Sequence, residues 1–121
     1  MASDFEGKVV LVTGGTRGIG KALALQLAEK GALLALNYMS RSSDAEQTVA
    51  EVEEHGVRAI AIAGDVSQPD AARSIVETAR EALGPIDMLV TSAGISIPGP
   101  ADDISWERWR TTMGINLDGT F

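Results

Sequence analysis

The sequence predicts an α/β fold in which a parallel β-sheet is doubly wound, with helices on both faces. Three observations lead to this prediction. Short, continuous apolar runs recur along the chain, helical periodicity fills the segments between them, and a glycine-rich turn joins the first run to the first helical segment. Continuous apolar runs are typical of strands that are covered on both faces. Their alternation with helices implies right-handed crossovers within one domain, residues 1–121.

The elements follow in order along the chain. The predicted strands are the apolar runs 8–12, 32–36, 59–63 and 86–90. Three helices lie between them, ending near Gly31, Gly56 and Gly84, and a fourth follows an open loop at 95–100. Apolar side chains recur at helical spacing in all four, and these are expected to face the core: Ile19, Leu23, Leu27; Ala45, Val49, Val52; Ile75, Val76, Ala79, Leu83; and Trp106, Trp109, Met113, Leu117, Phe121.

Composition excludes several classes of function. A 45% hydrophobic chain can build a packed core, whereas its net charge of −7, with no basic run, argues against nucleic-acid binding. The absence of cysteine and the single His55 exclude disulfides, thiolate chemistry and multi-histidine metal cages. No apolar run is long enough to span a bilayer, and the first residues do not resemble a signal peptide. We therefore expect a cytoplasmic protein with no membrane partner.

The glycine-rich turn is the most informative segment. It reads T-G-G-T-R-G-I-G and opens the first helix directly after the first strand. Gly14 permits a sharp turn, while Gly18 and Gly20 leave room for a pyrophosphate and for the neighbouring strand. The free N–H groups at the start of the helix attract the pyrophosphate, so the turn predicts a Rossmann-type dinucleotide site. The alternative interpretation is a tight turn in which the glycines have no binding role. The candidate residues are Gly14, Thr16, Arg17, Gly18, Ile19 and Gly20.

A nucleoside triphosphatase is the alternative reading of the same turn. Gly15, Gly20 and Lys21 nearly match the phosphate-binding loop of that class. The loop needs a serine or threonine after the lysine to ligate Mg²⁺, and Ala22 has no oxygen to offer. Mg²⁺-dependent ATP binding would be its signature.

Together these motifs make the chain resemble the short-chain dehydrogenase/reductase family, nearest to the 3-oxoacyl-carrier-protein reductase type. The family pattern T-G-x-x-x-G-I-G is met at every defined position. The resemblance implies an adenine contact at Asp65 and Val66, although Asp65 also suits a turn-capping role. Ser92, Ala93 and Gly94 stand where the family shows N-N-A-G, with Thr91-Ser92 replacing the asparagines. Asn116 matches the asparagine of the catalytic tetrad, and its other reading is a hydrogen-bonded core asparagine.

The second strand bears on the choice of dinucleotide. NAD sites place an acid at its end to bind the ribose 2′-hydroxyl, and Tyr38 stands there instead. Ser40 and Arg41 follow, and Arg17 lies in the glycine turn. Two guanidinium groups with no nearby carboxylate suit a 2′-phosphate, so NADP(H) is favoured and NAD(H) remains possible. The other interpretation of Arg41 is a solvated loop residue.

The rest of the tetrad, a serine and Tyr-x-x-x-Lys, is absent from the 121 residues. We therefore expect a truncated Rossmann fold, ending after the fourth strand and part of the next helix, with strand 86–90 exposed as an edge. It would be the cofactor half of an oxidoreductase that interconverts a small-molecule carbonyl and alcohol, inactive alone. A homo-oligomeric parent, or completion by the missing half, is expected. The alternative is a non-catalytic dinucleotide-binding or sensing module.

Overall fold

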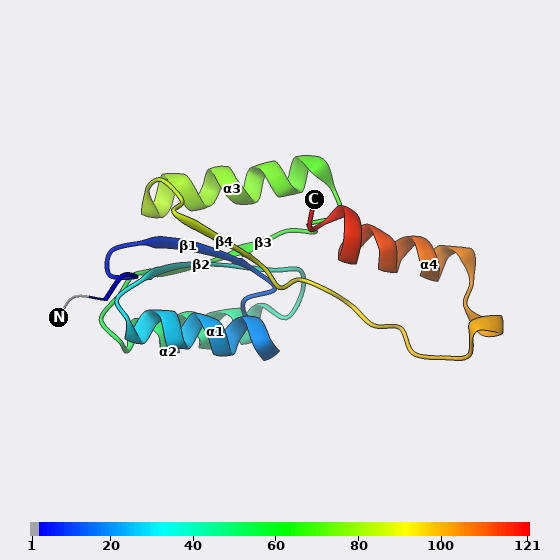
Figure 1. Cartoon of the computed structure of the whole chain (residues 1–121), viewed down its shortest axis with the longest axis horizontal. Helices are drawn as coiled ribbons and strands as arrows, with labels where there is room; N and C mark the ends of the chain where they lie inside the picture. The colour runs from blue at the N-terminus through cyan, green and yellow to red at the C-terminus, as the bar shows by residue number, and fades with distance from the viewer. Residues whose placement is uncertain (1–2) are drawn as a thin grey trace.

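The fold is built on a four-stranded parallel sheet. A computed structural model describes residues 3–121, with strands β1 (Val9–Thr13), β2 (Leu33–Tyr38), β3 (Ala59–Ala63) and β4 (Met88–Thr91). The strand order is β3-β2-β1-β4 (Figure 1). Val10 of β1 pairs with Leu34 on one side and with Met88 on the other. The doubly wound sheet is therefore confirmed, and its direction of winding reverses at β1.

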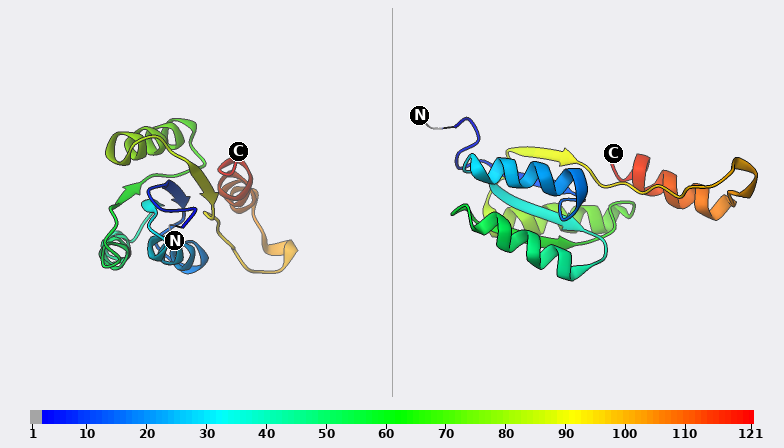
Figure 2. Two further views of the ribbon diagram at one scale, coloured as in Figure 1. Left: turned by 60° about the vertical axis from the view of Figure 1, so that its left-hand side comes forward. Right: turned by 90° about the horizontal axis from the view of Figure 1, so that it is seen from below.

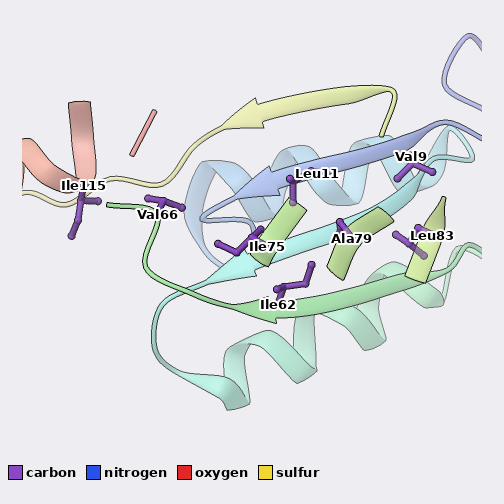
Figure 3. Packing of buried hydrophobic residues seen from close by; sticks show 9 residues of the cluster. Val9, Leu11, Ile62, Val66, Ile75, Ala79, Leu83 and Ile115 are labelled. Atoms are coloured by element: carbon purple, nitrogen blue, oxygen red, sulfur yellow. The ribbon is translucent and has the colours of Figure 1, made fainter. Parts of the chain in front are cut away.

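Helices cover both faces of the sheet (Figures 1 and 2). The helices α1 (Gly18–Glu29) and α2 (Ser42–Glu53) pack on one face, and α3 (Pro69–Leu83) packs on the other. Strand β1 is buried along its whole length, because its alternate side chains supply both layers. Val10 and Val12 face α1, whereas Val9 and Leu11 pack with the α3 side chains (Figure 3).

The apolar layer beneath α3 reaches toward the carboxyl ends of the strands. Ile75, Ala79 and Leu83 point from α3 onto Ile62 and β1, and Val66 and Ile115 extend the same cluster (Figure 3). Pro69 occupies the first turn of α3, where a missing N–H costs nothing, and Gly84 ends the helix at a φ of 102°. Because Val66 belongs to this layer, the packing holds the β3–α3 loop at the carboxyl end of the sheet.

Strand β4 forms an open edge, as expected. Among residues 3–121 it pairs only with β1, and Leu89 is 59% exposed. No helix within residues 3–121 is long and apolar enough to cross a membrane.

The last helical segment corrects one prediction. The helix α4 (Trp106–Met113) runs into a π-helical turn (Gly114–Asp118) and extends past the ends of the strands (Figure 2). Trp106, Trp109, Leu117 and Phe121 are exposed, so the expected core-facing stripe is wrong. Ile115 is the buried residue instead. Spacing shows that a helix has an apolar face but not which element covers it, and the π turn also shifts the phase of the stripe.

Ile19 also departs from its expected place. It is 84% exposed at the start of α1, while Ala24, Leu27 and Ala28 bury the helix against the sheet. Its side chain lines a cleft that is described below and does not enter the core.

Candidate functional site

A cleft of about 610 Å³ opens at the carboxyl ends of β1, β2 and β4. This edge is where ligands bind in open α/β sheets, at the point where the winding reverses. The cleft is lined by residues of four loops and by Ile115: Gly14, Thr16, Arg17, Gly18, Ile19, Asn37, Tyr38, Met39, Ser40, Gly64, Val66, Ser92, Ala93, Gly94 and Ile95. Eleven of the predicted site residues are in this set, whereas Gly20, Arg41, Asp65 and Asn116 are not.

Three of the four glycines in the turn, Gly14, Gly18 and Gly20, are required for different structural reasons. Gly14 has a φ of 61°, and a Cβ there would lie 2.8 Å from the Cα of Ala93. A Cβ on Gly20 would collide with the carbonyl oxygen of Gly14. Gly18 has a φ of 54° and open space around it, because it faces the cleft. Gly14 and Gly20 therefore pack the turn against its neighbours, while Gly18 leaves the approach to the helix start free.

Unpaired amides make the start of α1 a candidate anion site. The N–H of Lys21 donates to the carbonyl of Arg17, which closes the first helical turn. Within residues 3–121, the N–H groups of Gly18, Ile19 and Gly20 have no protein acceptor, and Arg17 supplies no side-chain cap. No acidic residue stands in the first turn. Free N–H groups and the positive end of the helix dipole attract a phosphate.

Two polar side chains that the sequence reasoning missed hold the walls of the cleft. The Thr13 hydroxyl accepts hydrogen bonds from the N–H groups of Ser92 (3.1 Å) and Ala93 (3.2 Å). Asn37, which is 2% exposed, bonds to both the glycine turn and the end of β3. The available signal was a polar residue within or just after an otherwise apolar strand run.

A third missed contact joins α2 to the glycine turn. The Thr48 hydroxyl is fully buried and lies 3.1 Å from the carbonyl of Thr16 and 2.8 Å from that of Asp44. Its single proton serves one of these acceptors at a time. Helix α2 thereby supports the back of the turn.

The loop after β2 corrects part of the cofactor argument. Arg41 begins α2 in a left-handed conformation, with a φ of 65°, and its side chain is exposed. Its Nη1 lies 4.0 Å from Oδ2 of Asp44, so the expectation of no nearby carboxylate is wrong. The i,i+3 spacing at a helix start was the overlooked signal. Arg17, Tyr38 and Ser40 line the cleft with no such ion pair in the part of the chain described.

Asp65 and Asn116 are bonded to other residues beside this cleft: Asp65 to its near neighbour Ser67, and Asn116 to Ile95, which lines the cleft. Oδ1 of Asp65 accepts hydrogen bonds from the Ser67 N–H (2.9 Å) and hydroxyl (2.7 Å), as a turn-capping residue does. Asn116 is bonded to the backbone of Ile95. The roles that resemblance implies for them, in adenine contact and in the tetrad, stay predictions.

Lys21 points away from the anion site. Its Nζ lies 3.2 Å from Oε1 of Glu51, which also accepts a hydrogen bond from Gln47 at 2.9 Å. The Gln47 hydrogen bond and then that of Lys21 lower the pKa of the Glu51 carboxyl below its usual value. A phosphate-binding-loop lysine must reach the phosphates, and this pairing does not support the triphosphatase alternative.

Comparison with known proteins agrees with the fold. A sequence model of the family described as short chain dehydrogenase matches residues 8–121. The chain is 36% identical over 121 residues to 3beta-hydroxysteroid dehydrogenase 1 of Eggerthella lenta, covering all of this chain and 46% of that one. It is 41% identical over 116 residues to an L-rhamnose 1-dehydrogenase (NAD(P)(+)) of Sphingomonas, covering 96% of this chain and 46% of that one.

A solved structure shows the same arrangement. A short chain dehydrogenase of Burkholderia cenocepacia, in complex with NADP, superposes with a TM-score of 0.91 at 42% identity, covering 95% of this chain and 47% of that one. The chain thus spans about half the length of the relatives that it matches.

Proposed function

The chain belongs to the short chain dehydrogenase family, and from that premise we propose that it is the NADP(H)-binding half of an oxidoreductase that interconverts a carbonyl and an alcohol. The observation that carries the proposal is the start of α1. There, three unpaired N–H groups and the open space at Gly18 meet a cleft at the winding reversal of the sheet.

The residues present fit a dinucleotide. The N–H groups of Gly18, Ile19 and Gly20 would hold the pyrophosphate, and the apolar side chains of Val66 and Ile115 offer a slot for an adenine ring. Asp65 would contact the adenine together with Val66, as the resemblance implies, and the segment 92–94 would contribute to the cofactor site. The bound cofactor would supply or accept the hydride, while the protein binds and orients it.

The 2′-phosphate preference rests on charge. The end of β2 carries Tyr38 and no acid, Arg17 and Ser40 line the cleft, and Arg41 follows at the start of α2, beside Asp44. The NADP-bound relative of 42% identity supports the same choice. Titration with NADPH and NADH at matched ionic strength tests it, and equal affinities would contradict it.

The substrate class is a small-molecule carbonyl or alcohol. The relatives named above are a steroid and a sugar dehydrogenase, so they do not single out the 3-oxoacyl-carrier-protein reductase type, which remains the subfamily that we propose from the sequence. The parent protein is proposed to be a cytoplasmic homo-oligomer. Light scattering of the parent protein tests the oligomer.

A non-catalytic dinucleotide-binding module is the second candidate. The two candidates differ in whether the parent reading frame encodes the serine and the Tyr-x-x-x-Lys segment. Finding both would contradict the module; a parent without them would contradict the oxidoreductase.

A further inference from the structure

Asn37 is the most completely bonded polar side chain at the cleft. It is 2% exposed near the end of β2, where the four preceding residues of the strand are apolar. Its Nδ2 donates to the carbonyls of Ile62 (3.2 Å) and Gly64 (3.1 Å), and its Oδ1 accepts from the N–H of Gly14 at 3.4 Å. The side chain alone therefore joins β2 to two segments on either side of it.

These two segments form facing walls of the cleft. Gly14 begins the turn that leads to the anion site, and Gly64 leads to Val66, which lines the other side. The backbone of Asn37 adds to the first link, because its carbonyl accepts the N–H of Gly15 at 3.0 Å. A planar amide offers two donors and an acceptor in fixed directions, which no apolar side chain or hydroxyl can reproduce.

We propose that Asn37 is a positioning residue for cofactor binding, and the inference rests on the proposed function. It sets the spacing between the glycine turn and the Gly64–Val66 segment, so that a dinucleotide meets a preformed cleft. If the amide were purely structural, replacing it would lower the stability of the fold and have no separate effect on cofactor affinity. A positioning amide affects affinity beyond what loss of stability explains, and it changes the protection of the Gly14 N–H.

Two variants separate these roles. Asn37→Thr suits a strand but removes the planar fork, whereas Asn37→Asp is nearly isosteric, keeps an acceptor for Gly14 and loses both donors. Val52→Ala is the matched control, because Val52 is fully buried in α2, outside the cleft, and its truncation lowers stability alone. Each chain is studied by amide hydrogen exchange, urea unfolding and NADPH titration.

Asn37→Thr should speed exchange at Gly14 by about tenfold after correction for global stability, and Asn37→Asp should not. Both should weaken NADPH binding by roughly 3- to 10-fold, the equivalent of about one hydrogen bond, while Val52→Ala leaves the affinity unchanged. Unchanged Gly14 exchange in Asn37→Thr, or affinity losses no larger than that of Val52→Ala, would overturn the proposal.

Hydrogen exchange of the Asn37 side-chain amide in the unmutated chain tests the proposal without any variant. Both Nδ2 protons of Asn37 should exchange far more slowly than those of a solvated amide, and free exchange would overturn the proposal even if neither variant folds. If the unmutated chain binds neither NADPH nor NADH, the proposed function fails. The Gly14 and Nδ2 exchange rates still decide, in that case, whether Asn37 holds the turn.

Discussion

Asn116 and Ile95 form two hydrogen bonds with each other, between the π-helical turn and the loop after β4. The side-chain Nδ2 of Asn116 donates to the Ile95 carbonyl at 2.9 Å, and the Ile95 N–H donates to Oδ1 at 2.8 Å. Ile95 lines the cleft and Asn116 lies in the π-helical turn after α4. This amide therefore joins the last helical segment to the loop that follows β4.

Removing that amide should loosen the loop without unfolding the sheet. Asn116→Ala is expected to cost about 1 kcal/mol of stability, because the two bonds lie at an exposed site. Exchange at the Ile95 N–H should rise, and urea unfolding should give the small stability loss. Leu117→Ala, an exposed neighbour, is the control and should change neither; equal exchange in the two variants would contradict the prediction.

Cofactor preference should depend on Arg41. NADPH is expected to bind at least several-fold more tightly than NADH, since a charge-assisted contact contributes roughly 1.5–3 kcal/mol. Arg41→Ala should reduce the difference in affinity between NADPH and NADH. Asp44→Asn should increase this difference slightly, because the substitution releases Arg41 from an exposed ion pair. Arg73→Ala, on the exposed face of α3, is the control for a lost charge. Titrations at one ionic strength measure all four chains, and a gap that Arg41→Ala leaves intact would count against the 2′-phosphate argument.

A side chain at Gly18 should block the anion site. Gly18→Val places a branched group at the open approach to the α1 amides, so dinucleotide affinity should fall at least about tenfold while circular dichroism still reports the fold. Gly56→Val shares the positive φ and the open surroundings, at the end of α2, and should keep full affinity. Retained binding in Gly18→Val would mean that the phosphate lies elsewhere.

The pKa of the Glu51 carboxyl should lie below its usual value. Because the pKa is lowered in the folded state, the associated stabilisation is present above the usual carboxyl pKa and is lost as pH falls through the lowered one. Gln47→Ala and Lys21→Met should each raise the pKa of Glu51. Carboxyl NMR titration of the three chains measures this, and an unmoved midpoint in both variants would refute the assigned causes.

The chain alone should bind NADPH without reducing a carbonyl. Hydride delivery leaves a developing alkoxide that needs a proton donor, and the single tyrosine, Tyr38, has a serine, not a lysine, four residues on. Loss of general acid catalysis costs about 10²- to 10⁴-fold in rate. NADPH consumption is followed in samples whose cofactor binding has been shown by fluorescence. Turnover at the rate of an intact reductase would point to Tyr38 or His55 as an unrecognised catalytic group.

Local patterns predicted most of the fold and the open start of α1 at Gly18. Continuous apolar runs identify buried strands wherever they lie, and the glycine turn carries its own conformational requirement, so 59–63 and Gly18 needed no tertiary information. The remaining features depend on partners that are remote in sequence. Asn37 gains its role from Gly14 and Gly64, 23 and 27 residues away. The exposure of Trp106 depends on what packs over α4, which periodicity does not encode.

The pairing of β4 with β1 also orders the assembly of the fold in time. Val10 pairs with Leu34 across one short crossover. Its pairing with Met88 spans a sequence separation about three times longer. Closing the longer loop costs roughly 1 kcal/mol more in chain entropy, and no hairpin offsets it in an all-parallel sheet. We therefore expect β1, β2 and β3 to pair first and β4 to dock last. On this order the Ser92–Gly94 wall would be the final part of the cleft to become native.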